Sequence, residues 1–182
     1  MMNPANAVTM LRILMIPVFA WAYYHGRTTV AFILFLLASA TDYLDGYLAR
    51  KFNAVTSVGK LLDPLADKLM LLTALYFFAD AGHIPWWVFI ALAVKEGGMV
   101  AGSLLMLEKK VVVHSNAFGK ASTVLFIVAI VSMFAGHYYA PMLQAGRILI
   151  YAALASSIVA MLIYGRNALS MRYAGDEGDE GK

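Results

Sequence analysis

The chain has 182 residues, of which 62% are hydrophobic and only 14% are charged. This apolar share exceeds what the core of a water-soluble domain of this length needs, so the composition favours an integral membrane protein. The absence of cysteine excludes a disulfide framework and any thiolate chemistry. The net charge of +3 is modest and distributed along the chain, which argues against nucleic-acid binding and suits contact with anionic lipids.

Six apolar segments are long enough to cross a bilayer, which requires about 20 mostly apolar residues. The connectors between them are short and leave no room for an inserted soluble domain. We therefore expect an all-α fold, a compact bundle of six transmembrane helices within residues 1–170, followed by a disordered acidic tail at residues 171–182. The six predicted spans are residues 9–25, 29–49, 60–79, 85–107, 118–139 and 142–165.

Lysine and arginine fall mostly on one side of this predicted bundle. Cytoplasmic loops of membrane proteins carry the excess of these residues, so we expect a multi-pass protein of the cell membrane with both termini in the cytoplasm. The connectors around residues 51–59 and 108–117 are expected on the same side. That side holds Arg50, Lys51, Lys60, Lys109, Lys110, Lys120, Arg166, Arg172 and Lys182, whereas the other side holds Arg27 and Arg147.

Four aspartates stand near the ends of the second and third predicted spans. Asp42 and Asp45 are three residues apart and Asp63 and Asp67 are four apart, so each pair shares one face of its helix. The short connector predicts that the two helices are antiparallel neighbours, which brings both pairs face to face at one depth near the cytoplasm. Carboxylates beside hydrocarbon are costly and usually mark a functional site.

Four converging carboxylates require a counter-charge, because they cannot all remain ionised side by side. Hard divalent cations such as Mg²⁺ or Mn²⁺ prefer oxygen ligands, and two ions about 3.5–4 Å apart would hold the attacking and leaving oxygens of a phosphoryl transfer. Gly46 and Gly59 leave space for a ligand. Arg50 offers a planar fork for phosphate oxygens, and Thr56 adds a hydroxyl.

These residues carry a resemblance to a known family. The pattern D-x-x-D-G-x-x-A-R, eight residues, G-x-x-x-D-x-x-x-D runs from Asp42 to Asp67 and matches the signature of the CDP-alcohol phosphotransferases at every fixed position. An opening N-x-x-T-x-x-R that begins at Asn6 also resembles the N-terminal segment of the family. Within the family, residues 6–19 and 63–68 are most similar to the phosphatidylglycerophosphate synthases.

The resemblance implies roles for the matching positions only. Implied metal ligands are Asp42, Asp45, Asp63 and Asp67, the last of which would also act as the general base. Implied contacts to CDP-diacylglycerol come from Asn6, Thr9, Gly46, Arg50, Thr56 and Gly59. The implied reaction attaches the phosphatidyl group to an alcohol and releases CMP, without a covalent enzyme intermediate. The family also implies a homodimer.

This signature does not specify the acceptor alcohol, because its residues contact the CDP moiety of the donor, which all of these reactions share. The resemblance favours glycerol 3-phosphate, with inositol phosphate and phosphatidylglycerol as alternative acceptors. A cation transporter is the contrasting hypothesis, but its charges should be spread through the membrane depth, whereas here they collect at one side.

Two lysines are candidates for the acceptor phosphate. Lys120 follows Gly119 as in a Gly-Lys element of the family, and we favour it as a phosphate contact over the alternative of a cytoplasmic snorkelling anchor. Lys95 stands where the similar synthases usually have arginine, and its alternative role is an internal ion pair with a motif aspartate or with Glu96. Lys60 and Lys68 flank the motif on the third predicted span, and either of them could offset its negative charge.

Small residues in the fourth predicted span permit a close helix contact. The segment from Gly98 to Gly102 would serve either a dimer contact or packing within the chain, and we favour the latter.

Overall fold

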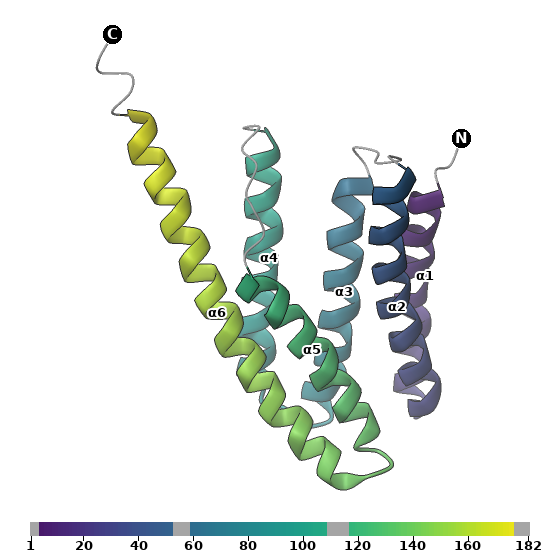
Figure 1. The fold of residues 1–182 in the computed structure, drawn as a ribbon. Helices are drawn as coiled ribbons and strands as arrows, with labels where there is room; N and C mark the ends of the chain where they lie inside the picture. Colours follow the sequence, from purple (N-terminus) through teal and green to yellow (C-terminus); the bar gives the residue numbers. More distant parts are fainter. Residues whose placement is uncertain (1–3, 53–58, 109–116, 177–182) are drawn as a thin grey trace.

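The computed structural model describes the backbone of residues 4–52, 59–108 and 117–176, and the side chains of residues 9–41, 65–100, 119, 121–163 and 166. In the described part of the chain every regular element is a helix, as the composition predicts (Figure 1). The helices are α1 (Pro4–Tyr24), α2 (Thr28–Phe52), α3 (Gly59–Asp80), α4 (Trp86–Glu108), α5 (Ala117–Ala135) and α6 (Ala140–Asp176).

The positions of the six helices agree with those of the six predicted apolar segments except at the C-terminal end. The predicted domain boundary at residue 170 lies inside α6, which continues to Asp176. Residues 166–174 contain neither glycine nor proline, so nothing in this stretch interrupts the helix. Residues 177–182, the remainder of the predicted acidic tail, lie outside the described residues.

Two connectors reverse the chain by the same glycine-dependent turn. Gly26 and Gly82 both have a φ of 70°, a left-handed conformation that a side chain would strain. After α1, the amide of Arg27 donates to the carbonyl of Ala22 at 2.9 Å. After α3, the amide of His83 donates to the carbonyl of Phe78, also at 2.9 Å. This pattern is a Schellman motif, which satisfies the last carbonyls of each helix and allows an abrupt turn.

The core is centred on Phe134, which brings α5 against the first three helices. Its ring lies 6.2 Å from that of Phe19 on α1, 5.4 Å from that of Phe32 on α2 and 5.0 Å from that of Phe78 on α3. Phe134 itself is 1% exposed. Aromatic pairs at these separations stabilise a core beyond the area that they bury. The cluster therefore holds four helices together near the ends at which α1 and α3 finish.

The closest helix approach lies between α5 and α6 rather than on α4. A Cβ atom built on Gly146 of α6 would come within 2.9 Å of the Ala129 carbonyl oxygen and the Met133 amide nitrogen of α5. By contrast, a Cβ atom on Gly98 of α4 would meet nothing within 4 Å. The expected close packing within the chain is therefore absent at Gly98, whereas the surroundings of Gly102 lie outside the described residues.

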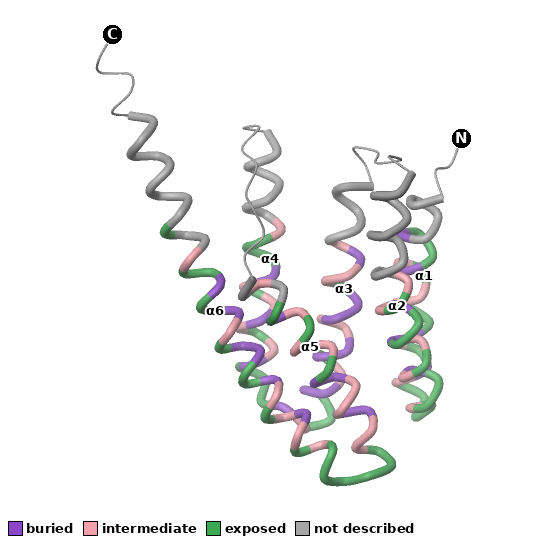
Figure 2. The backbone as a smooth tube through the Cα atoms, viewed as in Figure 1, coloured by how far each residue is buried: buried purple, intermediate pink, exposed green. Residues whose placement is uncertain are grey.

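Large apolar side chains cover much of the outer surface. On α1, Leu11, Leu14, Val18 and Trp21 form an exposed stripe at helical spacing, and Figure 2 shows further exposed residues on α2, α4, α5 and α6. Of the described helices, only α6 contains an apolar stretch long enough to span a membrane by length and composition, Ala140–Ile163. Shorter apolar stretches occupy Thr9–Tyr24, Thr28–Thr41 and Ala121–Ala135.

Candidate active site

The two motif-bearing helix ends lie on the same side of the bundle. The end of α2 and the start of α3 are neighbours there, and the start of α1 and the end of α4 lie on the same side of the bundle (Figure 1). At 1.5 Å of rise per residue, Asp42 and Asp45 lie about 10–15 Å before the end of α2, and Asp63 and Asp67 about 6–12 Å after the start of α3. The antiparallel arrangement therefore places both aspartate pairs at overlapping heights, as the sequence predicts.

Asp67 is the one motif aspartate whose side chain the structure describes, and it is partly buried. The side chains of Asp42, Asp45 and Asp63 lie outside the described residues, as do those of Gly46 and Arg50, although all of these positions belong to α2 or α3. Gly59 begins α3, Asn6 lies in α1, and Thr56 falls in a segment outside the described residues. Among the described side chains, no group of three potential metal ligands occurs.

A buried arginine from α1 reaches the same region. Arg12 and Asp67 line one small cavity of about 10 Å³, close to the space that one water molecule requires. Arg12 is only 1% exposed, and so is Thr9 one turn earlier. The remaining walls come from α2, α3 and α5, namely Phe35, Ala38, Ser39, Met70, Leu71 and Ile127. Four helices therefore meet around Asp67, and the opening N-x-x-T-x-x-R pattern supplies one wall.

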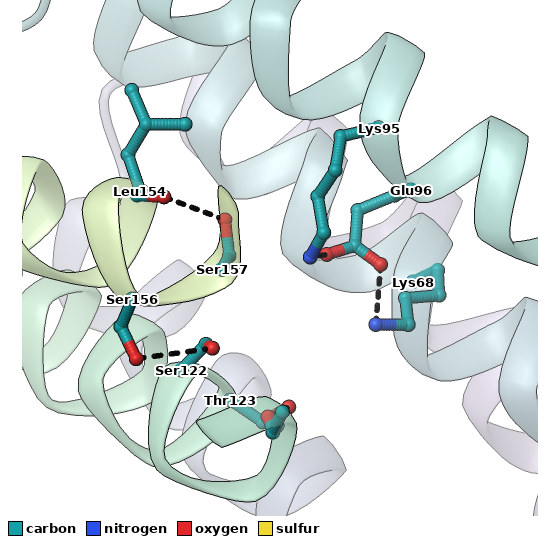
Figure 3. Close-up of polar contacts among 9 residues, drawn as sticks. Lys68, Lys95, Glu96, Ser122, Thr123, Leu154, Ser156 and Ser157 are labelled. Carbon is teal, nitrogen blue, oxygen red and sulfur yellow. Dashed lines mark hydrogen bonds and ion pairs between the residues drawn. The ribbon is translucent and has the colours of Figure 1, made fainter. Parts of the chain in front are cut away.

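On the α4 side of α3, three charged side chains form an ion cluster. The ammonium group of Lys95 donates to Oε1 of Glu96 at 2.5 Å, and Lys68 of α3 forms an ion pair with Oε2 of the same carboxylate (Figure 3). The side chain of Glu96 is 2% exposed, against 11% for Lys95 and 23% for Lys68. Of the two roles that the sequence leaves open for Lys95, the ion pair with Glu96 is present.

The sequence did not identify Glu96 as the shared partner of two lysines from different helices. Adjacent residues such as Lys95 and Glu96 point in directions about 100° apart on a helix, so spacing gave no signal for their contact. Lys120 lies in the first turn of α5, and its side chain is outside the described residues.

The comparison with protein families decides the classification. Residues 2–159 match the family described as CDP-alcohol phosphatidyltransferase. The chain belongs to this family. The family consists of transferases, so the prediction of an enzyme and the resemblance found in the aspartate pattern are both confirmed.

Several curated members of the CDP-alcohol phosphatidyltransferase family are similar along most of the chain. A "Probable phosphatidylglycerophosphate synthase" of Mycobacterium tuberculosis is 32% identical over 173 residues, which cover 92% of this chain and 82% of the relative. The CDP-diacylglycerol–glycerol-3-phosphate 3-phosphatidyltransferase of Bacillus subtilis is 37% identical over 145 residues, 71% of this chain and 75% of the relative. A Pseudomonas fluorescens protein of the same name is 40% identical over 107 residues, 57% of this chain and 54% of the relative.

Proposed function

We propose that this protein transfers the phosphatidyl group of CDP-diacylglycerol to glycerol 3-phosphate and releases CMP. The observation that carries the proposal is the similarity over 92% of the chain to a protein named as a phosphatidylglycerophosphate synthase. The Bacillus subtilis relative, whose name specifies both substrates, supports the same donor and acceptor. The complete aspartate signature on α2 and α3 supports the chemistry.

The enzyme is a multi-pass protein of the cell membrane in this proposal, with both termini and the active site facing the cytoplasm. The exposed stripe of Leu11, Leu14, Val18 and Trp21 supports contact with lipid, because water-soluble proteins rarely expose continuous apolar surfaces of this kind. The apolar stretch Ala140–Ile163 supports a span in α6. The excess of lysine and arginine at the motif end supports the orientation.

Two Mg²⁺ or Mn²⁺ ions complete the proposed site, and the donor set of four carboxylates at overlapping heights fits such hard cations. Asp42, Asp45, Asp63 and Asp67 would hold them. When bound, the ions supply neutralisation of the charge on the transferred phosphoryl group and on the departing CMP.

The chain's own residues orient the substrates and move the proton. Asp67 accepts the proton of the acceptor hydroxyl, whose oxygen forms a bond to the phosphorus that carries diacylglycerol. The bond from that phosphorus to the CMP oxygen breaks, and Arg50 stabilises the negative charge of CMP. Gly46, Gly59 and Thr56 make room for the CDP moiety and contact it.

The partners of Arg50 in holding the donor are Asn6 and Thr9 on α1. On the acceptor side, Lys95 and Lys120 provide the positive charge that a phosphate ester requires. Lys95 retains this role in the proposal because one ammonium group can bind Glu96 and a ligand phosphate at once, having three donors. The enzyme acts as a homodimer, as the family resemblance implies.

An assay of CMP release from CDP-diacylglycerol tests the proposal. Purified protein is supplied with Mg²⁺ and, in separate reactions, with glycerol 3-phosphate, inositol phosphate or phosphatidylglycerol. We expect CMP release that requires glycerol 3-phosphate and stops when EDTA removes the divalent ions. Release with inositol phosphate alone would refute the acceptor, and folded protein that releases no acceptor-dependent CMP would refute the function.

A further inference from the structure

The ion cluster of Lys68, Glu96 and Lys95 contains more positive than negative charges. One carboxylate binds two ammonium groups, so the cluster taken by itself carries a net charge of +1. Glu96 is almost completely buried and both lysines are at least three-quarters buried. A buried carboxylate that held the helices together would need only one lysine, and buried ion pairs add little net stability compared with apolar residues. Beyond Glu96, the cluster therefore has one positive charge left for a further anion, for which the motif carboxylates and a substrate phosphate compete.

The cluster lies beside the motif but on a different flank of α3. Asp67 faces the cavity between α1, α2 and α5, whereas Lys68, the next residue, contacts Glu96 on α4. Consecutive helical residues differ by about 100° in direction, which accounts for this division. A substrate whose hydroxyl meets Asp67 therefore has the positive cluster on the α4 side of the same helix turn.

Glu96 controls where both ammonium groups of the cluster lie. Its Oε1 accepts from Lys95 at 2.5 Å and its Oε2 binds Lys68, so neither lysine can turn without breaking a charged contact (Figure 3). Lysine side chains are long and flexible, and a free lysine would lose conformational freedom on binding a phosphate. A lysine already held by a buried carboxylate binds with less of this loss.

We propose that Glu96 is a positioning residue that fixes Lys68 and Lys95 so that their excess positive charge meets the phosphate of a small phosphorylated alcohol. This role rests on the proposed function, since it presumes that such an alcohol is the acceptor. Glu96 acts through the two lysines and does not touch the substrate. Its removal should therefore affect the acceptor and spare CDP-diacylglycerol.

The first test substitutes Glu96→Gln, which keeps the shape of the side chain and removes its charge. We expect the KM for glycerol 3-phosphate to rise by about tenfold or more, while the KM for CDP-diacylglycerol changes by less than about twofold. Asp80→Asn serves as the matched control, because Asp80 is an exposed carboxylate at the opposite end of α3. The control should leave both constants unchanged. Equal losses for the two substrates would overturn the positioning role.

The second test asks whether Glu96 acts through Lys68 and Lys95. In a background that carries both Lys68→Gln and Lys95→Gln, adding Glu96→Gln should change the acceptor KM by less than about twofold, because the two lysines that it positions are already absent. A carboxylate that merely holds the helices together would instead add its full effect in both backgrounds, and that result would contradict the proposal.

A third variant covers the case in which Glu96→Gln does not fold. Glu96→Asp keeps the charge but shortens the reach by one methylene, so that it cannot bridge both lysines, and it should raise the acceptor KM alone by about threefold. An unchanged acceptor KM in this variant would count against the inference. Wild-type enzyme without glycerol 3-phosphate activity would remove the proposed function itself, whereas normal wild-type activity with unaffected Glu96 variants would remove only the role of Glu96.

Discussion

The contact between α5 and α6 makes a sharp prediction for Gly146→Ala. Alanine favours a helix interior over glycine by about 1 kcal/mol, so propensity alone predicts a more stable protein. The structure predicts the opposite. A Cβ atom at this position would overlap Cγ of Met133 and lie 2.9 Å from both the Ala129 carbonyl oxygen and the Met133 amide nitrogen. Ordinary carbon contacts are about 3.5–4.0 Å.

The methionine side chain can rotate, but the two backbone atoms of α5 cannot move without displacing the helix. Inserting a methylene into a packed core costs about 1–3 kcal/mol, and the close contacts with two backbone atoms place Gly146→Ala in the upper part of this range, at about 2–3 kcal/mol against a propensity gain of about 1 kcal/mol. We expect a net loss of about 1–2 kcal/mol in the free energy of unfolding, or about 2–8 °C in Tm for a chain of this length.

Thermal unfolding of purified protein in detergent, followed by circular dichroism, measures this effect. Gly97→Ala is the matched control, since it lies inside α4 and a Cβ atom there would meet nothing within 4 Å. The control should be as stable as the wild type or up to about 1 kcal/mol more stable. A Tm for Gly146→Ala equal to or above that of the wild type would refute the packing argument.

Three further predictions concern the site, a histidine and an interhelical contact. Asp67→Asn should abolish CMP release, because the amide cannot accept the proton of the acceptor hydroxyl. Binding of CDP-diacylglycerol, measured by calorimetry, should be largely unchanged. Near-normal turnover would show that Asp67 is not the base. Burial, and then the charge of Arg147, lower the pKa of His83 below its usual 6.5. The folded state therefore disfavours protonation, so stability should decline as the pH falls below about 6.5, and His83→Gln should weaken this decline in pH-dependent melting curves. Tyr138→Phe removes a hydroxyl that is hydrogen-bonded to Thr29 at 2.5 Å. Because both residues are exposed, the free energy of unfolding should fall by less than about 1 kcal/mol. A larger loss would indicate that Tyr138 has a role beyond this hydrogen bond.

The helices and the aspartate motif could be predicted from the amino-acid sequence, because both depend on local features of the sequence. Long apolar runs separated by short polar connectors define where the helices begin and end, and Gly26 and Gly82 stand where the chain reverses. The spacing of Asp42, Asp45, Asp63 and Asp67 fixes which faces they share, since a helix repeats every 3.6 residues. The family followed from this spacing, and the family comparison confirms it.

The contacts between helices could not be predicted from the sequence in this way. These helices are apolar around most of their circumference, so no stripe of polar residues specifies how each one is rotated about its axis. That rotation decides that Gly146 rather than Gly98 lies against a neighbouring backbone, that Arg12 is buried beside Asp67, and that Glu96 binds lysines from two helices. Packing of the whole bundle sets these rotations together, because each helix buries whichever face fits the side chains of its neighbours.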